Sequence, residues 1–182
     1  MVNSKSAYSF AGKKQKPDTH IIVVGVDNEA GVLARVVGLF SGRGYNIESL
    51  AVAEVDQKQN ISRITIVTTG TPQVVDQIKL QLKKLVPVHK VADFKREDKK
   101  VIFKEMALFK VVGNSSKKEK ALKACKKYNP VILDKTNKSY VIQITALRRD
   151  IDAMSKSLKK FGLVSVSRTG AVAMTRGSEV FK

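Results

Sequence analysis

The chain has 182 residues, 43% of them hydrophobic, and a formal net charge of +18. This length allows one domain or two small ones with real hydrophobic cores, and no apolar run reaches the roughly 18–20 residues of a membrane-spanning helix. The single cysteine, Cys125, excludes a disulfide within the chain and favours a reducing compartment.

The chain begins with a basic segment, residues 1–19, which we expect to be a flexible tail because it lacks the apolar block of a secretory signal. Residues 20–26 form a short β-branched apolar run, which predicts a buried strand. Asp27 or Asn28 is then expected to cap a helix that ends at two glycines. The predicted inner face of this helix has apolar residues at helical spacing, namely Leu33, Val36, Val37 and Phe40.

Two strands and a second helix are expected next. Residues 47–55 and 61–69 have strand character and flank a polar turn. Thr71 is a good helix cap, and Pro72 suits the first helical position. Residues 88–94 then predict a fourth strand, so the order of elements in the first half is βαββαβ.

A highly charged segment, residues 93–100, marks the best domain boundary, and the second half repeats the order of the first. Ser116 and Glu119 fit a capping box for its first helix, and its second helix has an apolar stripe of Ile151, Met154, Leu158 and Phe161. Its strands are expected at residues 101–112, 131–133, 140–144 and within 163–174. The sequence therefore predicts an α+β protein of two ferredoxin-like βαββαβ units, with domains at 20–95 and 101–182.

The residues that most often carry chemistry give little sign of an active site. Cys125 lies at helical spacing from other apolar residues and has no neighbouring histidine, so we interpret it as a core residue rather than a nucleophile. His20 and His89 are expected to be ordinary strand-edge residues, since neither belongs to a cluster with metal-ligand spacing. No phosphate-binding loop is present either, so we predict neither catalytic residues nor a metal site.

The positive charge is concentrated in the second half. Residues 101–182 carry 18 basic and 6 acidic side chains, a net charge of +12. Such a charge favours acidic partners or nucleic acid, but the sequence has neither an RRM-type aromatic motif nor zinc-finger spacing. A solvated, lysine-rich surface is the simpler interpretation.

The start of the first helix is the strongest candidate for a binding site. Free backbone N–H groups at a helix start can hold a carboxylate, and Asn28, Gly31 and Asn46 are the residues most suited to complete such a site. Each has an alternative structural role: Asn28 as a helix cap, Gly31 in close helix–strand packing, and Asn46 in a turn.

The same region resembles a known family, the small regulatory subunit of acetolactate synthase, also called acetohydroxyacid synthase. The resemblance covers roughly residues 20–180, and the most specific block is Arg43-Gly44-Tyr45-Asn46-Ile47-Glu48-Ser49-Leu50. It is also carried by Asn28-Glu29-Ala30-Gly31-Val32-Leu33-Ala34-Arg35-Val36, by Ser62-Arg63-Ile64-Thr65-Ile66 and, near the end, by Ser167-Arg168-Thr169-Gly170 with Arg176-Gly177.

The resemblance implies an N-terminal ACT domain, a C-terminal ACT-like domain and a homodimer formed through the ACT domains. It implies no active site and no cofactor in this chain; thiamine diphosphate, Mg²⁺ and FAD would belong to the catalytic subunit. That subunit would be activated by this chain and inhibited through it by branched-chain amino acids, chiefly valine. The implied effector-binding residues are Asn28, Ala30, Gly31, Val32, Leu33, Asn46 and Ile47.

Three expectations follow from the layout of these residues. Asn28 and Asn46 flank one helix, which would separate them by on the order of 20 Å, so they can share a ligand most easily across a dimer interface. The edge strand that carries Leu50, Val52 and Ala53 needs cover, which side-by-side dimerisation would supply. The second half has Asn114-Ser115-Ser116-Lys117 instead of an Asn-x-x-Gly pattern, so no equivalent site is expected there.

An alternative interpretation is a free-standing amino-acid-sensing ACT protein whose basic half binds nucleic acid. No helix-turn-helix signal supports it. We expect a cytoplasmic location, with the plastid or the mitochondrial matrix as alternatives because the first residues are basic.

Overall fold

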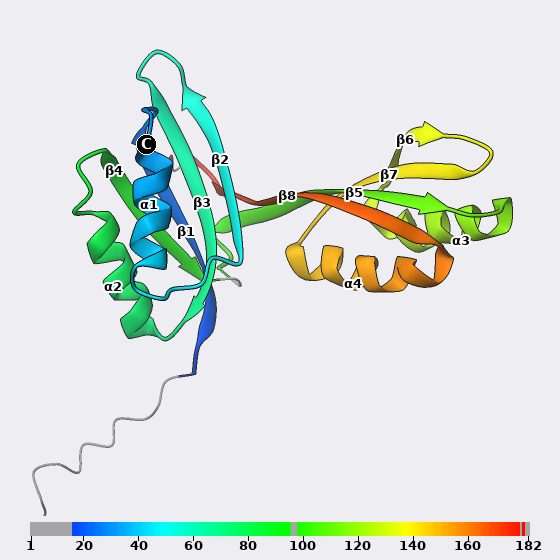
Figure 1. The fold of residues 1–182 in the computed structure, drawn as a ribbon, viewed down its shortest axis with the longest axis horizontal. Coiled ribbons are helices and arrows are strands. Elements are labelled where there is room, and N and C mark those ends of the chain that lie inside the picture. Colours follow the sequence, from blue (N-terminus) through cyan, green and yellow to red (C-terminus); the bar gives the residue numbers. More distant parts are fainter. Residues whose placement is uncertain (1–15, 96–97, 179, 181–182) are drawn as a thin grey trace, which may run out of the picture.

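The computed structural model describes residues 16–95, 98–178 and 180, so most of the predicted tail lies outside the described residues. Two four-stranded antiparallel sheets lie side by side in an elongated molecule, each with two α-helices on one face (Figure 1). The predicted α+β fold of two ferredoxin-like βαββαβ units is confirmed. None of the described helices has the length and apolar character that a membrane crossing requires.

The first sheet has the strand order β2-β3-β1-β4. Its core lies between this sheet and the two helices, and includes Ile22, Val24, Ile64 and Ile66. The strand β1 starts two residues before the predicted strand, inside the segment expected to be a tail. The elements are β1 (Asp18–Asp27), α1 (Val32–Ser41), β2 (Ser49–Asp56), β3 (Ile61–Gly70), α2 (Pro72–Leu82) and β4 (Val88–Lys95).

Helix α1 starts later than its sequence suggested. Its first residue is Val32, and the residue before it, Gly31, has a left-handed backbone and provides no side-chain cap. The expected cap at Asp27 or Asn28 is therefore wrong. The later start also changes the buried stripe, which is Val32, Val36, Leu39 and Phe40. Two residues of the predicted inner face, Leu33 and Val37, are instead exposed, at 41% and 37%.

The second sheet has the order β6-β7-β5-β8, the same topology as the first. Helix α3 is capped by Asn114, whose Oδ1 accepts from the N–H of Lys117 at 3.0 Å. The capping box predicted at Ser116 is therefore wrong, because the helix already starts at Ser115. The elements are β5 (Val101–Val112), α3 (Ser115–Cys125), β6 (Val131–Lys135), β7 (Ser139–Ala146), α4 (Arg148–Leu158) and β8 (Leu163–Thr175), with 3-10 turns at Lys126–Tyr128 and Lys159–Phe161.

The two histidines occupy different places in the first sheet. His89 is exposed on the edge strand β4, as expected, and its Nε2 lies 2.6 Å from a carboxylate oxygen of Asp27. His20 lies on the central strand β1 and is buried, with its Nδ1 2.8 Å from Asp93. The prediction that His20 is a strand-edge residue is wrong, because strands β3 and β4 cover both sides of β1.

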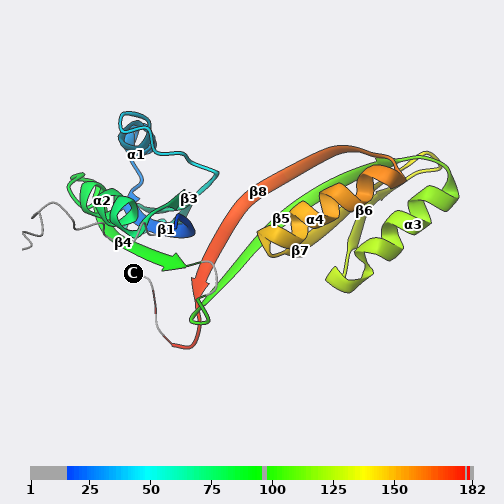
Figure 2. The same ribbon diagram turned by 90° about the horizontal axis from the view of Figure 1, so that it is seen from below.

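The two units are joined by a small apolar junction. The long strands β5 and β8 run together from the second sheet to the first (Figure 2), where Phe103 and Ala171 pack with Ile21 and Val67. Strand β8 meets the first unit closely: a Cβ on its Gly170 (φ +80°) would lie 2.7 Å from Oγ of Ser49. Only glycine combines this left-handed backbone with so close an approach.

Candidate functional site

The turn between β1 and α1 is open to solvent. Gly31 has φ +85°, a conformation that side chains with a Cβ rarely adopt. A Cβ at this position would meet no atom of the described residues within 4 Å. The glycine is therefore explained by its backbone conformation, and close packing among these residues does not explain it. The open space beside Gly31 can admit a ligand or a second chain.

Backbone donors line this turn. The N–H groups of Ala30, Gly31 and Leu33 have no acceptor among the described residues, whereas the N–H of Val32 donates to the carbonyl of Glu29 at 3.4 Å. Three unpaired N–H groups at the start of a helix suit an anionic group such as a carboxylate. The amide of Val32 is therefore a weaker donor for an anion than expected, whereas the amides of Ala30, Gly31 and Leu33 remain available.

The loop is held in place through Asn28. Its backbone N–H donates to the carbonyl of Asn60 at 2.7 Å, and its carbonyl accepts from Nδ2 of Asn60 at 3.2 Å. Its side-chain Oδ1 accepts from the hydroxyl of Ser62 at 3.0 Å. Because the oxygen is engaged, the NH₂ group is what Asn28 offers to a ligand, and it adds a further donor to the turn.

The apolar residues predicted for the site differ in their exposure. The side chain of Val32 is 3% exposed and belongs to the core, and Ile47 also packs partly against that core. Leu33, which was predicted to bind the effector, is exposed. Val37, which the sequence pattern assigns to the interior, is exposed as well. The exposed apolar surface nearest the turn is therefore formed by Leu33 and Val37.

Asn46 lies far from this turn within one chain. Its carbonyl accepts from the hydroxyl of Thr68 at 2.7 Å, whereas Asn28 is held by Ser62. Thr68 and Ser62 are six residues apart on strand β3, which corresponds to about 20 Å. A single chain therefore does not bring Asn28 and Asn46 together.

Strand β2 forms the edge of the sheet beside these two residues. Within the part of the chain that the structure describes, it pairs only with β3, and Val52 and Val55 are 42% and 51% exposed. Its start follows Asn46, and its end at Asp56 pairs with Ile61, close to the Asn28 loop. The strand thus spans the distance between the two predicted halves of the site.

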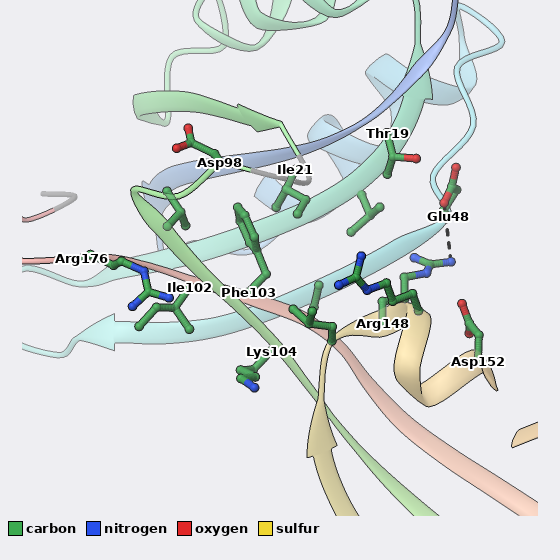
Figure 3. A pocket seen from close by; sticks show the side chains of 15 residues that line it. Thr19, Ile21, Glu48, Asp98, Ile102, Phe103, Lys104, Arg148, Asp152 and Arg176 are labelled. Carbon is green, nitrogen blue, oxygen red and sulfur yellow. Dashed lines mark ion pairs between the residues drawn. The ribbon is translucent and has the colours of Figure 1, made fainter. Parts of the chain in front are cut away.

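One concave site of the structure was not predicted from the sequence. A pocket of about 630 Å³ lies at the junction of the two units (Figure 3). Its lining comes from strands β1, β3, β5 and β8, from the loop before β2 and from the start of α4. No local pattern in the sequence could have indicated it, because the fold alone brings these segments together.

The chain is similar to known proteins over most of its length. Residues 22–90 match the model of an AHAS small subunit-like ACT domain, and residues 104–177 match the model of the small subunit of acetolactate synthase. An acetolactate synthase small subunit from Aquifex aeolicus is 39% identical over 90% of this chain and 84% of its own length. A probable acetolactate synthase small subunit from Methanothermobacter thermautotrophicus is 37% identical over 91% and 97%.

A solved structure agrees in both sequence and fold. The acetolactate synthase small subunit from Thermotoga maritima has a TM-score of 0.78 and 32% identity, and the match covers 88% of this chain and 99% of that one. The similarity spans both units, including the turn at Gly31 and the strands of the junction. The chain therefore belongs to the family of acetolactate synthase small subunits, the non-catalytic, ACT-domain subunits of that enzyme.

Proposed function

We propose that the chain activates an acetolactate synthase catalytic subunit and makes it sensitive to a branched-chain amino acid, chiefly valine, that binds at the turn between β1 and α1. The observation that carries this proposal is the open left-handed turn at Gly31, where unpaired N–H groups adjoin exposed apolar side chains. A free amino acid of this class has a carboxylate, an ammonium group and a small apolar body, and so it matches those features.

Each part of such an effector has a counterpart. The carboxylate accepts from the N–H groups of Ala30 and Gly31 and from the NH₂ group of Asn28. The branched side chain lies against Leu33 and Val37. The ammonium group needs an acceptor, and the side-chain oxygen of Asn46 can provide one.

A dimer would supply that acceptor. If the β2 strands of two copies pair antiparallel about a two-fold axis, the start of one strand lies beside the end of the other. The Asn46 end of one protomer then faces the Asn28 end of its partner, and two half-sites are completed at once. This pairing also covers the exposed edge at Val52 and Val55.

Regulation then follows from a shift in population. An effector that bridges two protomers binds only the dimer arrangement that closes the site, and it stabilises that arrangement by its difference in affinity. The activity of the catalytic subunit then depends on which dimer arrangement it contacts. In this proposal, thiamine diphosphate, Mg²⁺ and FAD belong to the catalytic subunit, and this chain acts only through contact.

The test is reconstitution with an acetolactate synthase catalytic subunit, measuring activity with and without valine. We expect Asn28→Ala and Gly31→Asp to keep the activation but to lose most of the valine response. Gly177→Asp is the matched control, because Gly177 is also left-handed (φ +71°) and a Cβ there would meet no described atom within 4 Å. If both site variants stay as sensitive to valine as the control, the site is wrongly assigned; if the unmodified chain changes neither activity nor inhibition, the proposed function fails.

A further inference from the structure

We infer that the pocket at the junction of the two units is a second ligand site, which takes a small organic anion: an oxyanion head group with an apolar body. This site is separate from the turn at Gly31. Its walls come from both units, with Thr19, Ile21 and Glu48 on one side and the start of α4 on the other.

The backbone N–H groups at the start of α4 are positioned to bind the anion. Its N-cap residue, Leu147, has no side-chain acceptor to offer, and the N–H groups of Arg148 and Arg149 have no acceptor among the described residues. The next two N–H groups, of Asp150 and Ile151, already donate to the carbonyl of Leu147. The positive end of an 11-residue helix therefore opens into the pocket with two arginines at its first two positions.

Arg148 is poorly satisfied within the chain. The one ion pair it makes in the described part, with Glu48, has an Nη2–Oε2 distance of 3.6 Å, which is too long for a hydrogen bond. Its Nη1 is buried and has no hydrogen-bond partner among the described residues. A guanidinium group in such a position gains most from an anion that accepts from it in the forked geometry of carboxylates and phosphates.

Each acidic residue of the pocket lining has at least one hydrogen-bond partner outside the lining. Glu48 accepts from the hydroxyl of Thr69 at 2.5 Å, and Asp152 accepts from Arg168 at 2.6 Å. Asp98 accepts from the backbone N–H of Lys100 at 2.9 Å. In contrast, Arg149 and Arg176 make no side-chain ion pair within the described residues. The pocket therefore has an excess of positive charge.

The rest of the lining sets the character of the ligand. In Figure 3 the side chains of Ile21 and Phe103 lie between Arg176 on one side and Arg148 on the other. Val101 adds to this apolar floor. A volume of about 630 Å³ lies within the usual range for small-molecule pockets and is larger than a bare inorganic anion needs. The pocket thus suits an anion that also has an apolar body.

Occupation of the pocket would affect the molecule beyond the site itself. A ligand held by α4 and by Ile21 contacts both units, so it favours one orientation of the second unit relative to the first. The same orientation sets how the pair of units meets any partner. The pocket is therefore a place where a metabolite can act on this chain independently of an effector at Gly31.

The test is isothermal titration calorimetry of the full chain with three probes: isovalerate, phenyl phosphate and the uncharged isovaleramide. We expect at least one of the two anions to bind with one site per chain, and isovaleramide not to bind. Preference for isovalerate indicates a carboxylate ligand, and preference for phenyl phosphate indicates a phosphate monoester. Arg148→Gln and Arg149→Gln should each weaken binding by about tenfold, since each removes a charge-assisted contact.

Two controls separate this site from other sources of binding. Lys120→Gln removes the same charge from the exposed face of α3, and it should change the affinity by less than about twofold because the surface charge it removes is screened. Asn28→Ala should leave binding unchanged, since it alters only the turn at Gly31. The inference is overturned if neither anion binds, if isovaleramide binds as well as isovalerate, if Lys120→Gln weakens binding as much as Arg148→Gln, or if Asn28→Ala is the variant that abolishes it.

Discussion

At the scale of single residues, the core of the second unit determines the chemistry of Cys125. The thiol is fully buried, and its Sγ lies 3.8 Å from the sulfur of Met154. Burial penalises the thiolate and raises the pKa of Cys125 from its ordinary value of 9.0 to about 11. The folded state therefore holds this proton more tightly than the unfolded state does, and that contribution to stability is lost as the pH rises from about 9 towards 11.

This burial predicts an unreactive thiol. At about pH 8 the folded chain should react with Ellman's reagent far more slowly than the chain in strong denaturant, where one thiol per chain should react at once. The measurement is the absorbance of the released thionitrobenzoate over time, in the absence and presence of the denaturant. Equal rates in the two conditions would mean that Cys125 is accessible and that its core role is wrong.

At the scale of elements, one buried lysine fixes helix α3 to the hairpin of β6 and β7. Lys118 is 2% exposed, and its Nζ donates to the carbonyls of Thr136 and Asn137 at 2.8 and 2.7 Å. The same Nζ lies 4.7 Å from the centre of the Tyr140 ring. The ammonium group thus satisfies the turn between two strands while its aliphatic stem packs against the sheet.

Lys118→Met should therefore destabilise the chain although it keeps the apolar stem. It leaves two turn carbonyls without their donor, which costs about 1–3 kcal/mol of the free energy of unfolding. Lys117→Met is the matched control, because Lys117 is the exposed neighbour on the same helix. Urea denaturation of the two variants measures the difference, and equal stabilities would contradict the role given to Lys118.

The elements also show what the sequence could and could not predict. Thr71 and Pro72 start α2 as expected, since local side-chain chemistry decides a capped start. Helix α1 begins later than predicted because a left-handed glycine ends the preceding loop, and a residue pattern does not reveal backbone handedness. That shift moved Val32 into the core and exposed Val37, which changed the apolar part of the candidate site. The wide separation of Asn28 and Asn46 followed from helix length alone.

At the scale of the whole molecule, the two units share a topology but differ at the start of their first helix. The first unit opens its first helix with the left-handed Gly31, while the second closes the equivalent position with the side-chain cap of Asn114. The pocket at the junction could not be predicted from the sequence of either unit alone, because residues of both units line it. The first unit thus has an open turn, the second has a capped turn, and the pocket lies between the two units.

The proposed dimer depends on the edge strand β2. Val52 is 42% exposed on the edge strand β2, and a lysine there should block strand pairing because it places like charges near the two-fold axis. We expect Val52→Lys to weaken the dimer by at least about tenfold while the chain stays folded, since the side chain is at the surface. Val172→Lys, at a 53% exposed valine of β8, is the matched control and should leave the dimer intact. Sedimentation equilibrium measures both, and valine binding measured on the same samples should be lost only where the dimer is lost, because each half-site of the proposed dimer needs the other protomer. A Val52→Lys chain that remains dimeric and binds valine as tightly as the control would show that β2 is not the dimer interface.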